Sequence, residues 1–156
     1  MSIGTFVVGL VCGIGLTAVV GVFAMPKLML VTHKSTLGFN EALEALEKTI
    51  ADSGWSSPGT IDLCASMEKH GVECPRRVAV VQMCHPEYAK EVLTTDPHVS
   101  ALMPCAIAVW ESEDGTVHFS KMNTGLMGKL FGGTIAKVMG GKVSKDEQAI
   151  LQGLVG

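Results

Sequence analysis

The chain has 156 residues, enough for one domain with some length to spare, and 47% of them are hydrophobic. Its formal net charge of -3 argues against binding to nucleic acid, which needs a basic face to release counterions. The chain also contains no C-x-x-C, H-E-x-x-H or G-x-S-x-G motif and no phosphate-binding glycine loop. The sequence therefore favours a protein without enzymatic activity.

The first segment of the chain is apolar. Residues 3–25 carry no charged side chain, and a helix of that length, at about 1.5 Å per residue, spans the roughly 30 Å hydrocarbon core of a bilayer. A cleaved signal peptide needs a basic start, which Met1–Ser2 does not provide. The sequence predicts an uncleaved single-pass anchor over residues 1–26, with membrane lipid as a partner. Lys27 and Lys34 favour a cytoplasmic domain, and the opposite orientation stays open.

Small residues recur every four positions along this span, namely Gly9, Gly13, Thr17 and Gly21. Such a stripe lets two helix backbones approach closely in lipid, so it predicts that the anchor associates with itself and that the protein is a homo-oligomer. The alternative is that membrane helices carry extra glycine without packing through it.

Behind the anchor, hydrophobic patterning predicts an α+β domain over residues 27–123. Leu28–Thr32 is a short apolar run suited to an edge strand. An amphipathic helix follows, with its apolar face marked by Phe39, Leu43, Leu46 and Ile50. The next expected elements are a helix at 61–69 capped by Thr60, a buried strand at 78–83 and a helix at 87–93 after Pro86.

The segment Met103–Glu111 is the one around which the domain is organised. It begins through Pro104 and ends before the turn Asp114–Gly115, which leads into a strand at 117–121. Because it is too apolar to face water on both sides, it belongs in the centre of a sheet. The predicted fold class is α+β: a small mixed or antiparallel sheet with helices packed on it, preceded by one N-terminal transmembrane helix.

Residues 124–156 form a glycine- and methionine-rich C-terminal tail with helical spacing. It holds six glycines between Gly125 and Gly141, and each costs a helix roughly 1 kcal/mol relative to alanine, so a free helix would be marginal. Packing against other subunits or the membrane surface is one interpretation, and a flexible flap is the other; the sequence favours packing. Ser144–Glu147 has the pattern of a capping box for a last helix.

The five cysteines fall in three settings. Cys12 lies in the membrane span. Cys64 and Cys74 flank a helix end, where a disulfide can join them in an oxidising compartment, with two unpaired thiols as the alternative. Cys84 ends one predicted strand and Cys105 begins another, each beside a proline. If those strands are neighbours, the two thiols meet at one edge of the sheet.

Soft donor atoms cluster around the same edge. The candidates for binding a cofactor are, in falling order, His85, Cys105, Cys84, Met103 and His118, with His85, Cys84 and Cys105 as metal ligands. Sulfur and imidazole donors suit haem iron, copper or zinc. Cys84 also precedes a helix N-terminus, where the helix dipole favours a thiolate and persulfide chemistry. The alternative is that these side chains only fill the core.

Several motifs together resemble one known family: Gly54-Trp55, Cys84-x-Pro86-Glu87, Leu102-Met103-Pro104-Cys105-x-Ile107-Ala108-Val109-x-Glu111, Asp114-Gly115 and Met122-Asn123. They are similar to the family catalogued as domain of unknown function three-hundred-and-two, and the glycine-rich tail resembles its membrane-anchored subgroup. The block from Met-Pro-Cys to Asp-Gly is the most specific part. The resemblance implies a small α+β domain that tends to associate, often exported or anchored, in organisms with sulfur or anaerobic metabolism. The family has no settled activity.

Three functions stay open on the sequence alone. The first is a membrane-anchored, homo-oligomeric binding protein for a soft ligand, haem or a transition metal, with a role in electron transfer or sulfur metabolism. The second is a thiol or sulfur-transfer protein that uses Cys84 or Cys105. The third is a structural subunit of a membrane complex, with the other subunits as partners.

Overall fold

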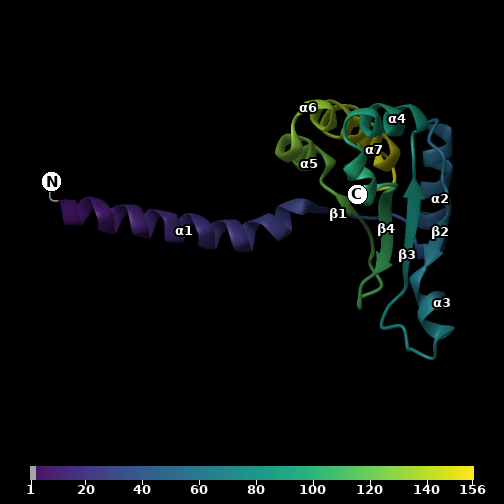
Figure 1. Cartoon of the computed structure of the whole chain (residues 1–156). Coiled ribbons are helices and arrows are strands. Elements are labelled where there is room, and N and C mark those ends of the chain that lie inside the picture. The colour runs from purple at the N-terminus through teal and green to yellow at the C-terminus, as the bar shows by residue number, and fades with distance from the viewer. Residues whose placement is uncertain (1–2) are drawn as a thin grey trace.

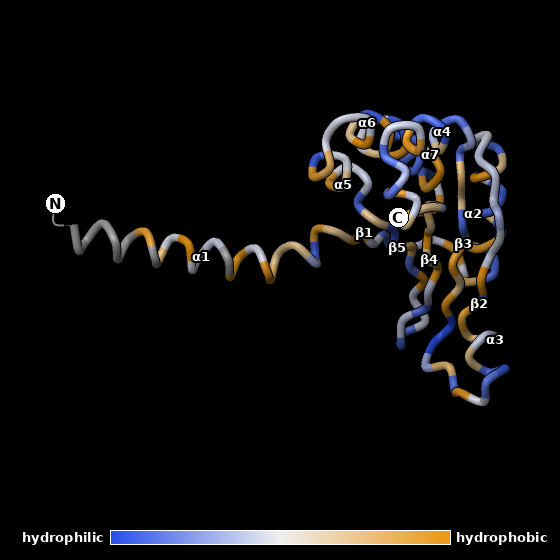
Figure 2. The backbone as a smooth tube through the Cα atoms, in the orientation of Figure 1, coloured by the Kyte–Doolittle hydropathy of each residue, from blue (hydrophilic) through white to orange (hydrophobic). Residues whose placement is uncertain are grey.

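A long N-terminal helix and an α+β domain make up the molecule (Figure 1). The computed structural model describes residues 3–156, and for residues 3–9, 11, 16 and 18 it describes the helical backbone alone. Helix α1 (Ile3–Met29) projects away from the domain and is long and apolar enough to cross a membrane. Figure 2 shows hydrophobic residues recurring along it.

Helix α1 extends beyond the boundary that the sequence suggested. Pro26 was expected to end it, but the helix continues to Met29 with Pro26 inside. A proline removes one backbone donor, and near a C-terminus this disturbs few hydrogen bonds, so one further turn forms. The first strand therefore begins at Leu30 and not at Leu28.

The domain is built on a five-stranded antiparallel sheet in the order β1-β5-β4-β3-β2. The strands are β1 (Leu30–Lys34), β2 (Thr60–Asp62), β3 (Val78–Met83), β4 (Cys105–Glu111) and β5 (Val117–Met122). The prediction of a central strand before Asp114–Gly115 is confirmed, because β4 pairs with β3 on one side and β5 on the other. The α+β class is confirmed as well, with the sheet antiparallel, and β1 is an edge strand as expected.

Helices and turns complete the domain. They are α2 (Phe39–Asp52), α3 (Leu63–Glu68), α4 (Pro86–Thr95), the 3-10 helix η1 (Pro97–Leu102), α5 (Thr124–Phe131), α6 (Gly133–Ile135), the π-helix η2 (Ala136–Val143) and α7 (Ser144–Leu151). The core forms between α2 and one face of the sheet, where Leu46 and Ile50 pack in one cluster with Val81, Ile107 and Phe119. The predicted amphipathic helix is thus confirmed.

One expected helix is partly a strand. Residues 61–69 were predicted to form a helix capped by Thr60, whereas Thr60–Asp62 form β2 and the helix starts at Leu63. Ile61 pairs with Val80 on the edge of the sheet, and this pairing overrides the local helical preference. Asp62 then becomes the cap, since its carboxylate accepts a hydrogen bond from the Ala65 amide at 3.0 Å.

The C-terminal segment packs on its own chain. Ile135, Val138, Val143 and Ile150 are buried in the same cluster as the sheet residues. Two glycines explain how the backbones come so close: a Cβ added to Gly128 would lie 2.7 Å from the Gly140 Cα. The segment 124–156 therefore contributes to the core of the domain, where another subunit or the membrane had been expected as its partner.

The proposed capping box at Ser144 does not form. Helix η2 runs directly into α7, so Ser144 lies inside a continuous helix and has helical backbone angles. The Glu147 side chain instead accepts hydrogen bonds from Lys121 and Thr124. A buried tertiary contact has taken the carboxylate that the local motif would use.

Candidate functional site

A small cavity lies where β3 ends and β4 begins. Its volume is about 20 Å³, and its lining comes from the two strand ends, the start of α4 and helix η2. Four of the five predicted site residues line it, namely Cys84, His85, Met103 and Cys105. The remaining wall is mostly apolar, with Trp55, Met83 and Val138 among its side chains. Two thiols, an imidazole and three thioethers (Met83, Met103 and Met139) thus line one small, mostly apolar space.

The backbone of Cys84 is fixed on both sides. Its amide donates to the Ser56 carbonyl at 2.8 Å, and its carbonyl accepts from the Ser56 amide at 2.9 Å. The Ser56 hydroxyl donates to the same carbonyl, also at 2.9 Å. Pro86 opens α4 two residues later, so Cys84 lies just before a helix N-terminus, as the sequence predicted. This bridge positions the thiol independently of the helix.

Cys105 is a partly buried thiol that packs against the core cluster. It is the first residue of β4 and pairs with Met83, on the sheet face that also carries Ile107 and Val109. Burial raises the pKa of Cys105 to about 12, and the negative charges of Glu147 and Cys84 act in the same direction. At neutral pH Cys105 is therefore a protonated thiol.

Three aromatic rings form one wall. The His85 ring stacks on the Tyr88 ring with centroids 3.9 Å apart, and the Trp55 ring meets both edge-on at 5.5 Å and 5.8 Å. The Trp55 indole donates to Asp146 at 3.2 Å. Burial and the Asp146 carboxylate raise the pKa of Tyr88. His85 Nδ1 is buried without a hydrogen-bond partner among the described atoms, so the ring has unused hydrogen-bonding capacity beside the cavity.

His118 lies elsewhere. Its ring stacks on Trp110 at 4.5 Å on the opposite side of β4 from Ile107, and its Nε2 is 3.4 Å from the Ser112 hydroxyl. Trp110 is five residues along β4 from Cys105, which corresponds to roughly 17 Å of strand. The structure therefore does not bring His118 to the cavity, because alternation and distance along the strand both separate them.

The sulfur and imidazole donors around the cavity do not form a preorganised site for zinc or for haem. Within residues 3–156, no group of three or more His, Cys, Asp or Glu side chains is arranged to hold a metal ion. Structural zinc takes four such ligands, so the residues do not fit it. A cavity of about 20 Å³ has room for one water-sized group, so haem does not fit between these walls.

A buried ion pair lies near the cavity. Lys121 Nζ donates to Glu147 Oε2 at 2.7 Å, and the Thr124 hydroxyl donates to the same oxygen at 2.7 Å. Both charged side chains are almost fully buried, at 8% and 2% exposure. The pair connects β5 to α7 and sets part of the electrostatic field at Cys105.

The other two cysteine settings differ from this one. Cys64 and Cys74 are joined in a disulfide with a Cα–Cα distance of 5.1 Å. Cys12 is an exposed free thiol on α1. Gly13 and Gly21 of the predicted stripe have open space around them, and the Thr17 hydroxyl donates to the Gly13 carbonyl at 2.8 Å. The surroundings of Gly9 lie outside the described residues.

Several residues of the cavity escaped the sequence argument. Trp55 appeared there only as part of a family motif, and Tyr88 is one helical turn after His85, a spacing that could have suggested their stacking. Met139 and Asp146 come from the C-terminal segment, and no local signal connects them to a strand end. Their place depends on how that segment folds back.

Comparison with known proteins now identifies the family. The model of the family described as "Domain of unknown function DUF302" matches residues 31–152. The chain belongs to the DUF302 family. The match begins one residue into β1, so α1 precedes it.

Two relatives illustrate how far the likeness extends. The crystal structure of an uncharacterized conserved DUF302 protein from Bacillus stearothermophilus superposes with a TM-score of 0.71 at 19% identity, over 80% of this chain and 97% of that one. This likeness shows a shared DUF302 fold. An uncharacterized protein of Aquifex aeolicus (strain VF5) is 38% identical over 47 residues, and the match spans 30% of this chain and 33% of the relative.

Proposed function

We propose that this DUF302 protein is a membrane-anchored sulfur carrier in which Cys84 takes up a sulfur atom as a persulfide. The observation that carries the proposal is that Cys84 and Cys105 line one apolar cavity with room for a single water-sized group. A persulfide adds only one sulfur atom to a thiol. The cavity suits a ligand of that size better than any larger one.

The chemistry of loading is a transpersulfidation. The Cys84 thiolate attacks the outer sulfur of a donor persulfide, R–S–SH, and forms a new S–S bond. The S–S bond of the donor breaks, and the donor leaves as the thiolate R–S⁻. No net oxidation or reduction takes place, so no further reactant is needed. Cys84 lies just before the N-terminus of α4, on a backbone that its two hydrogen bonds with Ser56 hold in place.

Cys105 has a protective role in this proposal. As a thiolate it would attack the inner sulfur of the Cys84 persulfide, form a Cys84–Cys105 disulfide and release hydrogen sulfide. Its pKa of about 12 keeps it protonated at neutral pH, so this loss is slow. The rings of His85, Tyr88 and Trp55 shield the same space from water, and His85 Nδ1 offers a hydrogen bond to the bound sulfur.

Mass spectrometry of the full chain tests the proposal. All variants carry Cys12→Ser, which removes the exposed free thiol of α1. After incubation with glutathione persulfide, we expect one added sulfur atom on this parent protein and on its Cys105→Ser variant, and none on its Cys84→Ser variant. The double variant Cys64→Ser/Cys74→Ser is the matched control and should load normally, because its cysteines lie outside the cavity. Sulfur uptake by Cys84→Ser equal to that of the parent protein would refute the assignment.

A second candidate is a Cu(I) site. It is favoured by the two thiols and the thioethers of Met83 and Met103 in one cavity, beside an imidazole nitrogen without a partner. Cu(I) accepts few, soft ligands, so it does not need the four-ligand group that zinc does. Titration against a chromophoric Cu(I) chelator separates the candidates: copper binding requires both Cys84 and Cys105, whereas sulfur loading requires Cys84 alone.

The anchor belongs to the proposal as well. We assign α1 as a single transmembrane helix and the chain to a membrane-anchored branch of DUF302 proteins, because α1 is exposed, apolar and outside the matched domain. The Cys64–Cys74 disulfide supports an oxidising compartment for the domain, against the two lysines that favour the cytoplasm. Protease digestion of right-side-out membrane vesicles should therefore degrade the domain, and complete protection would place it in the cytoplasm.

Self-association through α1 is the final element. Gly13 and Thr17 of the stripe are exposed, and a Cβ added at Gly13 or Gly21 would meet open space, as a close helix interface in lipid requires. Gly13→Ile should weaken the homo-oligomer in cross-linking of native membranes, whereas Gly15→Ile, on the same helix but off the stripe, should not. If neither sulfur nor copper binds and other subunits co-purify, the role as a structural subunit of a membrane complex takes precedence.

A further inference from the structure

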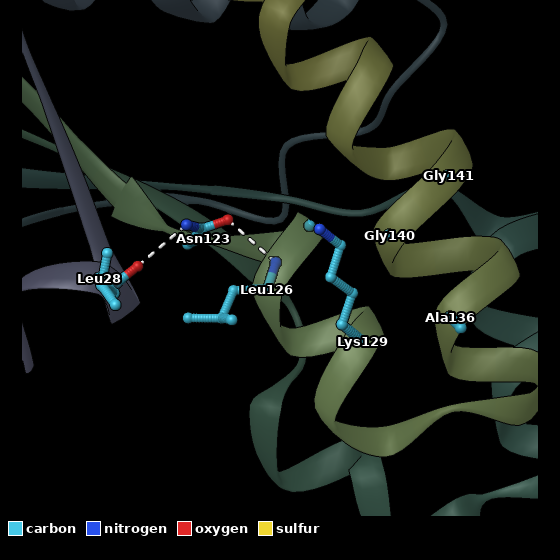
Figure 3. Close-up of a pocket in the computed structure, with 8 residues that line it drawn as sticks. Leu28, Asn123, Leu126, Lys129, Ala136, Gly140 and Gly141 are labelled. Atoms are coloured by element: carbon cyan, nitrogen blue, oxygen red, sulfur yellow. Dashed lines mark hydrogen bonds between the residues drawn. The ribbon is translucent and has the colours of Figure 1, made fainter. Parts of the chain in front are cut away.

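A hollow of about 570 Å³ lies at the junction of the domain and α1. Its wall includes Leu28 from the end of α1, Leu126 and Lys129 from α5, and the backbone of Gly140 and Gly141 from η2. Figure 3 shows the Lys129 side chain extending into the space between α5 and the helix that carries these glycines. Volumes of this size are typical of small-ligand sites.

Asn123 attaches this hollow to the end of α1. Its side-chain amide donates to the Leu28 carbonyl at 2.9 Å, and its side-chain oxygen accepts from the Leu126 amide at 3.0 Å (Figure 3). The backbone N–H of Asn123 also donates to the Met29 carbonyl at 2.8 Å. Since Lys27 is the first charged residue after the apolar span, the start of α5 lies at the level where α1 leaves the hydrocarbon.

The side of the domain that faces along α1 carries exposed apolar side chains. Figure 1 shows α5 on the side from which α1 departs, and there Leu130 and Phe131 are 55% and 47% exposed. Leu28 and Leu30, which border the same junction, are 53% and 61% exposed. Exposed apolar side chains that continue directly from a spanning helix are typical of contact with a bilayer.

The chain segment that forms α5 and η2 carries only positive charges. From Asn123 to Val143 the chain contains three lysines and no acidic residue. Lys142 is paired with Glu91, whereas Lys129 is exposed and forms no ion pair among the described residues. A lysine flanked by glycine backbone and leucine side chains matches a lipid headgroup, which offers a phosphate beside its acyl chains.

We infer that α5 rests on the bilayer surface, with Leu130 and Phe131 in the interface, and that the hollow takes the headgroup phosphate of an anionic phospholipid through Lys129. The inference rests on the proposed anchoring of α1, because a helix that spans the bilayer holds α5 next to the lipid surface. That anchoring favours lipid over a second copy of the chain as the occupant of this face. It adds to that proposal a lipid class and a fixed orientation of the domain, with the cavity of Cys84 held at a set height above the membrane.

Hydrogen exchange on the full chain in nanodiscs tests this. With phosphatidylcholine alone and with added phosphatidylglycerol, we expect amides of residues 124–131 to exchange more slowly than in detergent. Phosphatidylglycerol should add about fivefold protection, the effect of one lysine at an anionic surface. Lys129→Gln should remove that added protection, and Lys48→Gln, which changes the same charge on α2 away from α1, should not. Leu130→Ser/Phe131→Ser should raise exchange in both lipids, unlike Leu93→Ser on α4.

Each other outcome is decisive. Equal exchange in both lipids and detergent, with the chain retained in the nanodisc, overturns the docking of α5 and leaves the anchor intact. Failure to enter nanodiscs overturns the anchor together with the inference. Protection by inorganic phosphate in phosphatidylcholine discs, equal to that from phosphatidylglycerol, would assign the hollow to a free anion. Thermal unfolding of each variant confirms that these exposed substitutions leave the fold unchanged.

Discussion

Two pairs of cysteines lie at opposite ends of strand β3, and they differ in almost every respect. Cys64 and Cys74 precede the strand, on an exposed excursion whose helix α3 has no buried residue, and they form a disulfide. Cys84 follows the strand and Cys105 begins its neighbour β4, where both thiols are free and half-buried against the core.

The difference separates two uses of sulfur. The first pair is close in sequence, so its bond constrains a local loop that has little core of its own. The second pair is brought together by the pairing of β3 with β4. Its thiols lie among methionine, valine and aromatic side chains, whose packing stabilises this part of the fold without a disulfide. The Cys64–Cys74 bond uses both sulfur atoms for stability, whereas the free thiols of Cys84 and Cys105 remain able to react.

The largest effect on this contrast should come from Glu147→Gln. The substitution leaves the Lys121 ammonium buried without its charged partner, which costs about 3–5 kcal/mol of the free energy of unfolding. It also removes a negative charge that raises the pKa of Cys105. The pKa should therefore fall, and the Cys105 thiol should be alkylated faster at a given pH. Urea denaturation and iodoacetamide labelling of Cys105 in a Cys84→Ser background measure the two effects.

Its matched control is the double variant Lys121→Met/Glu147→Leu, which replaces both charges by apolar side chains of similar length. Replacement of a whole buried pair is close to neutral in stability, so most of the lost free energy should return. If the double variant is as unstable as Glu147→Gln, the cost comes from packing around α7 and not from an unpaired charge.

A smaller effect should follow from removal of the disulfide. Cys64→Ser/Cys74→Ser releases a short loop, and loop entropy predicts a loss of about 2–3 kcal/mol in the free energy of unfolding. Dithiothreitol should shift the urea midpoint of the wild type to that of the variant and leave the variant itself unchanged. A wild type that does not respond to reduction would contradict the contrast between the two pairs.

Much of the sheet was predictable because its signals are local. The apolar run of β4, its proline entry and the Asp114–Gly115 turn each depend on adjacent residues, and together they placed the central strand correctly. The amphipathic helix α2 followed from spacing alone. The meeting of Cys84 with Cys105 was also predictable, because it needed only that two neighbouring strands pair antiparallel.

The C-terminal segment was less predictable, because its contacts are between backbones. Glycine at 128 and 140 lowers helix propensity, which the sequence shows, but it also permits the close crossing of α5 and η2, which only tertiary structure reveals. The aromatic wall depends on that crossing, since Asp146 reaches Trp55 from α7. His118 was misplaced for a simpler reason: proximity along the chain said nothing about which face of β5 it occupies.

The last effect concerns the pH dependence of stability, and over the range measured below it amounts to about 2 kcal/mol. The pKa of Cys105 is about 12 in the fold and near 9.0 when unperturbed, so the native state retains a proton that the unfolded state releases in between. Below about pH 9 the Cys105 thiol is protonated in both the native and the unfolded state, so its contribution to the free energy of unfolding does not change with pH. From there towards about pH 12 the free energy of unfolding should fall by about 1.4 kcal/mol per pH unit relative to Cys105→Ser, which cannot ionise. Urea midpoints of both proteins at about pH 8 and about pH 10.5 measure this difference. A difference that stays constant would mean that Cys105 is solvated, and the protection of the proposed Cys84 persulfide by a protonated Cys105 would then lose its physical basis.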